Sequence, residues 1–323
     1  MKLTLVARPP SDTNLTLLRQ LGIVHAVHYD MADLPDDFEA LSAIRDRYRR
    51  HGLAWKIAES GPAIDRIVMG KEGARGQTER YARIVRHLGR LGVEVVAYNF
   101  MPQVSEDAMV ARTSFGMPTR GGALTSAFRL ADFHDGMIAH EEVPIPREQM
   151  WDNLERFLRA VLPSAEDAGV RLAMHPDDPP MPELCGLSRI MGSVEDFERL
   201  LALSGSQANA LTFCIGCFAE RGYDIPSLAR RFAPRTAFLH IRDIRGSLED
   251  FHETFPDDGQ TDLAAVLRAF VSAGFEGYAR SDHAPRLATE TAPEHDGYGM
   301  QGHIFGIGYL RGLLHAIERE PGP

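Results

Sequence analysis

A junction that repeats along the chain constrains its fold more than any other feature. An amphipathic segment ends at a glycine, and a short apolar run follows directly. This occurs five times, at Gly22, Gly52, Gly92, Gly169 and Gly274. Glycine readily adopts the left-handed conformation at the end of a helix, and a short apolar run bounded by turns indicates a buried strand. The sequence therefore predicts a repeated unit of helix, glycine and strand.

The segments around these junctions support that unit. Apolar residues recur at helical spacing before three of the glycines, from Tyr81 to Leu91, from Trp151 to Leu162 and from Leu263 to Val271. Ser193 followed by Asp196 is the signature of a capping box, which predicts a fourth helix over Val194–Leu203.

Eight apolar runs qualify as strands, and helical segments separate them. This alternation over 323 residues favours an α/β fold made of a single (β/α)8 TIM barrel rather than a doubly wound sheet. No GxGxxG or Walker motif supports a nucleotide-binding fold. The predicted strands are Leu3–Val6, Val24–His28, Ala54–Ala58, Glu94–Tyr98, Arg171–Met174, Leu211–Phe213, Ala237–Ile241 and Gly277–Ala279.

Two connections are much longer than usual, and they follow the fourth and seventh predicted strands. They run from Pro102 to about Arg147 and from Arg242 to about Asp262. Long loops of this kind usually cover active sites. No linker or composition break marks a second domain, so we expect one domain over residues 1–323, with 102–147 as a lid or active-site insertion.

Composition excludes several classes of function. The 35 Lys and Arg residues are outnumbered by 45 Asp and Glu residues, which gives a net charge of −10 and argues against nucleic acid as a partner. The apolar stretch before Arg8 is too short for a signal peptide or a membrane span. Three cysteines, an odd number, suit a reducing compartment. We expect a cytoplasmic protein with a small-molecule partner and no membrane partner, and we leave a homo-oligomer open.

Four consecutive predicted strands end in residues that can bind a metal. These are His175, Cys214, His240 and Asp282. The carboxyl ends of barrel strands converge on one face, so these side chains are expected to meet. Two imidazoles, a thiolate and a carboxylate would bind a divalent cation and leave positions open for substrate oxygens. Any one of them alone would more often be a loop or core residue, and Cys217 is interpreted as packing.

Other strand-end residues are candidates for binding substrate. Arg242 and Arg280 lie beside predicted ligands, where a guanidinium can hold a carboxylate, although either could instead pair with a neighbouring aspartate. Asn99 could bind substrate or cap backbone. His28 and Glu59 end the second and third strands, where a site role and a structural role are both open.

Several separated strings resemble the D-mannonate dehydratase family, and they are spread over most of the chain. They are YNFMP, HPDDPP, LTFCIG, HIRDIRG, FHETFPDDG and RSDH, followed by GYGMQG. The resemblance implies a xylose-isomerase-like TIM barrel and a hydro-lyase that removes water from D-mannonate to give 2-keto-3-deoxy-D-gluconate. It implies Mn²⁺ as the cofactor, with Fe²⁺, Co²⁺ or Zn²⁺ as alternatives, and assigns the metal to the same four residues. It also implies that Asp282 and Tyr298 transfer protons.

The chemistry needs a base for the C2 proton and an acid for the leaving C3 oxygen. The candidates are Asp282, His283 and Tyr298, and the sequence does not assign the two roles among them. The chain departs from the family after YNFMP, over residues 103–113, and Ser281 replaces the usual proline. A divergent member that dehydrates another aldonate is therefore an alternative, as are a metal-dependent sugar isomerase or epimerase of the same superfamily and a regulator that has lost catalysis.

Overall fold

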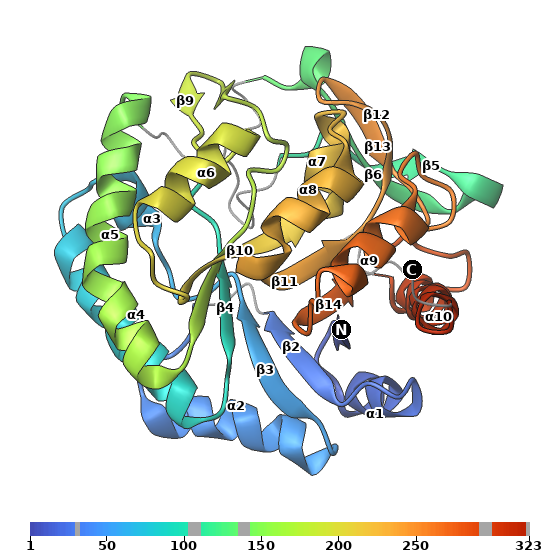
Figure 1. The fold of residues 1–323 in the computed structure, drawn as a ribbon, viewed down its shortest axis with the longest axis horizontal. Coiled ribbons are helices and arrows are strands. Elements are labelled where there is room, and N and C mark those ends of the chain that lie inside the picture. Colours follow the sequence, from blue (N-terminus) through green and yellow to red (C-terminus); the bar gives the residue numbers. More distant parts are fainter. Residues whose placement is uncertain (30–32, 103–110, 135–142, 291–298, 321–323) are drawn as a thin grey trace. The chain divides into compact units, whose positions relative to one another are not determined.

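A closed barrel of eight parallel strands forms the centre of the fold. The strand order is β1-β14-β11-β10-β7-β4-β3-β2, and this confirms the predicted α/β barrel. The computed structural model describes residues 1–29, 33–102, 111–134, 143–290 and 299–320. The barrel strands, most of them labelled in Figure 1, are β1 (Lys2–Val6), β2 (His25–Tyr29), β3 (Ala54–Glu59), β4 (Val95–Tyr98), β7 (Arg171–Met174), β10 (Asn209–Cys214), β11 (Thr236–Ile241) and β14 (Tyr278–Ser281).

Helices separate the barrel strands along the chain. The five junction glycines all have positive φ, between 66° and 84°, so the repeated signal is confirmed. The capping box at Ser193 and Asp196 is also present. The α-helices are α1 (Asp12–Gln20), α2 (Phe38–Arg50), α3 (Asp65–Met69), α4 (Ala74–Arg90), α5 (Arg147–Ala168), α6 (Val194–Ala202), α7 (Ile215–Glu220), α8 (Ile225–Phe232), α9 (Leu263–Ser272) and α10 (Met300–Ile317).

The chain divides into two compact units. The first comprises Met1–Ile23, Arg112–Phe133 and Phe213–Pro323. The second comprises Val24–Ala111 and His134–Thr212. Strand β10 begins in the second unit and ends in the first.

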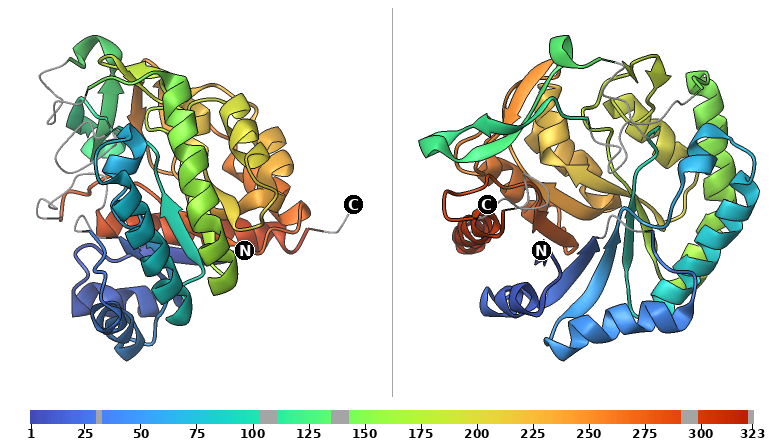
Figure 2. Two further views of the ribbon diagram at one scale, coloured as in Figure 1. Left: turned by 90° about the vertical axis from the view of Figure 1, so that its left-hand side faces the viewer. Right: turned by 180° about the vertical axis from the view of Figure 1, so that it is seen from behind.

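In the second unit, β2, β3, β4, β7 and the start of β10 pair in parallel. Helices α4 and α5 lie side by side (Figure 2). Aromatic side chains fill the space beneath them, because Tyr81 of α4 contacts Phe157 of α5 at a ring distance of 5.0 Å, and Phe157 in turn contacts Tyr98 of β4 at 5.8 Å. The two short strands β8 (Glu183–Leu184) and β9 (Leu187–Ser188) form a hairpin after β7.

In the first unit, β1, β14 and β11 pair in parallel. A separate four-stranded sheet, which we call the inserted sheet, joins segments from the two long connections in the order β12-β13-β6-β5. These antiparallel strands were not among the predicted strands, because each is short and only partly apolar. The elements are β5 (Ser114–Pro118), β6 (Leu124–Arg129), β12 (Ile244–Ser247) and β13 (Asp250–Glu253), with the 3-10 turns η1 (Arg120–Gly122), η2 (Leu130–Asp132) and, before β11, η4 (Ala233–Arg235).

Candidate metal centre

Three of the four predicted metal ligands lie together in the first unit. Cys214 ends β10, His240 lies in β11, and Asp282 follows β14. Each offers one ligand atom, and these atoms all lie within 4.8 Å of one another. The Cys214 Sγ atom lies 4.0 Å from Asp282 Oδ2, and His240 Nδ1 lies 3.6 Å from Asp282 Oδ1. All three residues are buried.

The strand register explains why His240 and Asp282 meet. His240 pairs with Arg280 and Ile241 pairs with Ser281, and the Asp282 amide donates a hydrogen bond to the Ile241 carbonyl at 3.1 Å. Side chains that end parallel strands therefore share one edge, as the barrel argument requires.

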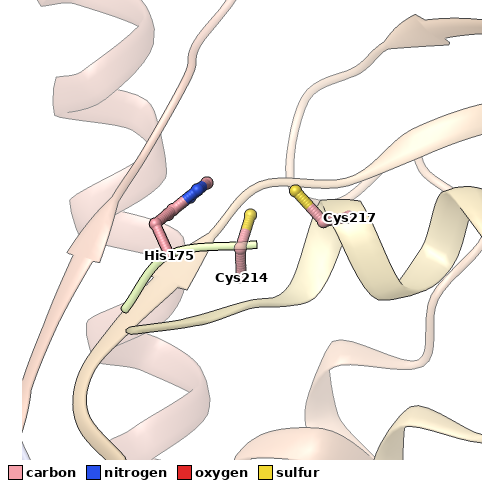
Figure 3. Close-up of side chains that lie close together, drawn as sticks. All are labelled: His175, Cys214 and Cys217. Atoms are coloured by element: carbon pink, nitrogen blue, oxygen red, sulfur yellow. The ribbon is translucent and has the colours of Figure 1, made fainter. Parts of the chain in front are cut away.

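A second cysteine lies close to Cys214 (Figure 3). Cys217 comes from α7 and is also buried, and its sulfur accepts a hydrogen bond from Arg242 Nη2 at 3.2 Å. Cys217 thus has a polar partner in addition to its packing contacts. The third residue in Figure 3, His175, follows β7 and belongs to the second unit.

The two arginines that were predicted to bind substrate both contact Asp282. Arg242 Nε lies 3.3 Å from Asp282 Oδ2, and Arg280 Nη2 forms an ion pair with Asp282 Oδ1. Arg280 Nε also donates a hydrogen bond to His240 Nε2 at 3.3 Å. In addition, Arg242 Nη1 lies 2.9 Å from Glu220 and 3.4 Å from Glu253.

Burial raises the pKa of Asp282, but His283, Arg280, His240 and Arg242 outweigh this effect and hold that pKa well below its usual range. The carboxyl group is therefore ionised at neutral pH. An ionised carboxylate is the form that binds a metal.

Arg242 needs a glycine beside it. A Cβ atom on Gly216 would lie 2.6 Å from the Cζ atom of Arg242, which is shorter than carbon atoms tolerate. The glycine at the start of α7 thus leaves room for the guanidinium, which is only 1% exposed.

His283 forms a hydrogen bond through Nδ1 with Glu253 Oε1 at 2.6 Å, and its Nε2 lies 3.8 Å from Asp282 Oδ1. Burial lowers the pKa of His283, but Asp282 and Glu253 raise it above the usual value for histidine. The same Glu253 oxygen pairs with Arg112 Nη2 at 2.8 Å. Sequence reasoning did not single out Glu253, Arg112 or Glu220. The only signal was the FHETFPDDG string, which contains Glu253.

The second unit places four candidate residues at or near strand ends. His175 directly follows β7, and its amide donates to the Tyr98 carbonyl at 2.8 Å. Asn99 follows β4, and its buried Oδ1 accepts no hydrogen bond from the described part of the chain. Glu59 ends β3 and precedes Ser60, which has a φ of 69°. Strained backbone of this kind is enriched at functional sites.

His28 has a structural partner. Its Nδ1 lies 3.1 Å from the Tyr48 hydroxyl, and its ring packs edge-on against Trp55 at a ring distance of 5.3 Å. Within the sequence-based candidates, Tyr298 and most of the 103–113 stretch lie outside the described residues.

The cluster of Cys214, His240 and Asp282 has the chemistry of a metal site. Thiolate, imidazole and carboxylate groups together suit borderline divalent cations, and their burial would exclude competing water. The two arginines beside them can hold an anion. This arrangement can activate a substrate that carries a carboxylate and hydroxyl groups.

Known proteins resemble this chain over nearly its full length. A family model described as D-mannonate dehydratase (UxuA) matches residues 9–140 and 104–321. A mannonate dehydratase of Shouchella clausii is 32% identical and covers 93% of this chain and 91% of its own. Mannonate dehydratase 1 of Bacillus licheniformis is 30% identical, with 96% and 93% covered.

Solved structures agree with these sequence matches. The mannonate dehydratase of Streptococcus suis serotype 2 superposes with a TM-score of 0.89 at 29% identity, over 99% of this chain and 95% of the other. A xylose isomerase domain protein of Alicyclobacillus acidocaldarius has a TM-score of 0.64 at 16% identity, over 98% and 99%, and shows the shared barrel alone. With the family model matching most of the chain and relatives at 30% identity or more, the chain belongs to the D-mannonate dehydratase family, whose members are hydro-lyases.

Proposed function

We propose that this protein dehydrates D-mannonate to 2-keto-3-deoxy-D-gluconate and water in a reaction that depends on a divalent metal. Membership of the family supports the reaction. The observation that carries the proposal is the buried cluster of Cys214, His240 and Asp282, because it supplies the donor set that a metal-dependent member needs.

The fourth ligand in this proposal is His175. In the pairing of β7 with β10, Met174 lies opposite Leu211. Continuing this register would place His175 opposite Thr212, and Thr212 is two residues before Cys214 in the sequence. The His175 ring is oriented by a hydrogen bond between Nδ1 and the Pro176 carbonyl at 2.7 Å. A backbone carbonyl in this role fixes the tautomer and leaves Nε2 as the ligand atom.

The charges near Asp282 favour an acidic substrate. Three arginines and three carboxylates balance one another in the first unit: Arg112, Arg242 and Arg280 against Glu220, Glu253 and Asp282. A divalent cation together with the Cys214 thiolate would leave the site with net positive charge. The carboxylate of a sugar acid would neutralise it.

The metal would act as a Lewis acid that stabilises the charge developing beside the substrate carboxylate. The chain's own groups then move the protons. His283 and Tyr298 are proposed to transfer the protons. Asp282 could also transfer a proton, but only through a carboxylate oxygen that does not bind the metal. Each such group typically contributes on the order of 10² to 10⁴ in rate.

Arg242 and Arg280, which both contact Asp282, are proposed to hold the substrate carboxylate. Asn99 is proposed to bind a substrate hydroxyl, because its buried Oδ1 has no other hydrogen-bond partner within the described ranges. Glu59, which ends β3, is also proposed to bind substrate. The contacts of His28 with Tyr48 and Trp55 favour a structural role for that residue.

Mn²⁺ is the proposed metal, with Fe²⁺, Co²⁺ and Zn²⁺ as alternatives that suit the same donors. We further propose that the chain acts as one domain, that its 102–147 segment covers the site, and that the protein works in the cytoplasm. A homo-oligomer is compatible with this function. No helix in the described part of the chain is long and apolar enough to cross a membrane.

A turnover assay tests the proposal. Purified protein is stripped of metal, reconstituted with Mn²⁺, Fe²⁺, Co²⁺ or Zn²⁺, and supplied with D-mannonate, and the 2-keto-3-deoxy acid is measured. Metal-dependent product supports the proposal. If the protein instead turns over another aldonate, that aldonate is its substrate and the assignment of D-mannonate is wrong. Turnover of a neutral sugar would favour the isomerase or epimerase alternative.

A further inference from the structure

Glu253 lies among the buried charged residues of the first unit and was not predicted from the sequence as a site residue. It ends strand β13 of the inserted sheet, and its side chain is 3% exposed. One oxygen, Oε1, contacts three groups: Arg112 Nη2 at 2.8 Å, His283 Nδ1 at 2.6 Å and Arg242 Nη1 at 3.4 Å. The inserted sheet thus delivers a carboxylate directly to His283.

The contact decides which nitrogen of His283 carries a proton. An ionised carboxylate can only accept hydrogen bonds, so His283 Nδ1 must be the donor. In the neutral ring, Nε2 is then the atom with a lone pair. This Nε2 faces the metal cluster, because it lies 3.8 Å from Asp282 Oδ1.

Glu253 is itself held in place. The Arg112 guanidinium donates through Nε to Ser126 Oγ of β6 at 3.0 Å and lies over the Phe251 ring of β13 at 5.2 Å. Strand pairing of Ile244 with Glu253 fixes the backbone. A buried carboxylate held by a buried arginine and by strand pairing has little freedom to reorient, which is the property needed to orient a second group.

We propose that Glu253 is a positioning residue that holds the His283 ring with Nδ1 protonated and Nε2 directed at the reacting atoms. Arg112 fixes Glu253, and the Glu253 carboxylate orients the His283 ring by accepting a hydrogen bond from its Nδ1. The catalytic part of this inference rests on the proposed function, because it takes His283 to act on the substrate. A purely structural Glu253 would only neutralise Arg112 and Arg242.

The direct test reads the His283 ring without using activity. The full-length protein is labelled with ¹⁵N in its histidines, and the His283 signals are assigned by their loss in His283→Asn. Spectra are recorded over a range of pH, and the tautomer is read where the ¹⁵N signals themselves show the neutral ring. We expect an Nδ1-protonated ring in the wild type and a loss of that form in Glu253→Leu, because leucine offers no hydrogen-bond acceptor to Nδ1. An unchanged ring in Glu253→Leu would overturn the inference.

Kinetics provide the second readout. Glu253→Gln should lower kcat by about 10- to 100-fold with a smaller change in KM, as the loss of orienting partners does elsewhere. If Glu253 acts through His283, adding Glu253→Gln to His283→Asn should cause no further loss. An equal loss in both backgrounds would contradict the inference and support the structural alternative.

Two further variants serve as controls. Glu253→Asp keeps a charge near Arg112 but withdraws it from His283 by one methylene, so it should also lose kcat, and it replaces Glu253→Gln if that variant does not fold. Asp243→Asn removes another buried carboxylate, which accepts hydrogen bonds from the Thr261 hydroxyl, the Thr261 amide and the Ile244 amide, each at 2.8 Å. It should lower stability and leave the His283 ring and kcat within about twofold of wild type.

The outcomes separate the two proposals. A wild type without dehydratase activity but with the expected His283 tautomer and its loss in Glu253→Leu would reject the function and retain the positioning role. An active wild type whose Glu253→Leu variant has an unchanged ring and whose Glu253→Gln variant has an unchanged kcat would reject only the positioning role.

Discussion

Cys214 and His240 supply two of the donors in the buried cluster, and each comes from a different barrel strand. We predict that Cys214→Ser or His240→Ala abolishes bound metal and turnover together, because removing one of four ligands weakens the site severely. Metal content is measured by elemental analysis and turnover with D-mannonate. Cys185→Ser, which alters a half-buried cysteine between β8 and β9, should retain both. A Cys214→Ser protein that turns over without metal would refute the ligand assignment.

Gly216 tests the role proposed for Arg242. Alanine is normally the better helix residue, by about 1 kcal/mol, yet its Cβ would push the Arg242 guanidinium aside. We predict that Gly216→Ala raises KM or lowers kcat for the acid by at least tenfold, on the order of one good ionic hydrogen bond. Gly312→Ala in α10 meets no atom within 4 Å and should leave kinetics unchanged. Equal kinetics for the two variants would exclude Arg242 from substrate binding.

At the residue scale, the sequence identified groups at the ends of strands and missed groups that come from elsewhere. Cys214, His240 and Asp282 follow from strand order alone, and they do lie together. Glu253 ends β13 of the inserted sheet and Arg112 lies just before β5 of the same sheet, whose pairing brings β13 and β6 together across more than a hundred residues. No local pattern reports such a contact, so both residues escaped prediction.

At the element scale, helix α6 offers a test of how local signals stabilise the fold. The Ser193 side chain accepts a hydrogen bond from the Asp196 amide, and the Asp196 side chain accepts from the Ser193 amide. Ser193→Ala should lower the free energy of unfolding by about 1 kcal/mol, the usual worth of such a cap. Ser42→Ala inside α2 should not destabilise, because alanine favours helix interiors. Urea denaturation of both variants distinguishes a cap from a general loss of hydroxyl groups.

The loop after β7 contains a carboxyl group whose ionisation opposes folding. Burial raises the pKa of Asp177 to about 6 from 3.8, despite the lowering effects of Arg189 and the Met191 amide. The pKa of Asp177 is higher in the folded protein than in the unfolded chain. The contribution of protonated Asp177 to folding stability is therefore complete below about pH 3.8 and is lost as the pH rises through about 6.

We therefore predict that, as the pH rises from 4 to 7, the free energy of unfolding of the metal-free wild type falls by on the order of 2 to 3 kcal/mol relative to that of Asp177→Asn. Parallel unfolding curves for the two proteins across that range, measured against urea, check this difference. A constant stability difference between them would show that Asp177 titrates normally.

The whole molecule was largely predictable. Five glycine junctions, eight strands and the intervening helices predicted the barrel, and all eight strands lie within two residues of their expected bounds at either end. This succeeded because each element's pattern is local: a strand is a short apolar run, and a helix has a fixed apolar period. The inserted sheet could not be predicted in the same way, because its short strands depend on partners far away in sequence for their stability.

At the scale of the whole molecule, we propose that the protein dehydrates D-mannonate with a divalent metal held by the buried residues Cys214, His240 and Asp282. The most direct measurement is formation of the 2-keto-3-deoxy acid from D-mannonate by the wild-type protein with and without added Mn²⁺. We expect product only when metal is bound, and none from Cys214→Ser. Stoichiometric bound metal with no product from D-mannonate would contradict the proposed function.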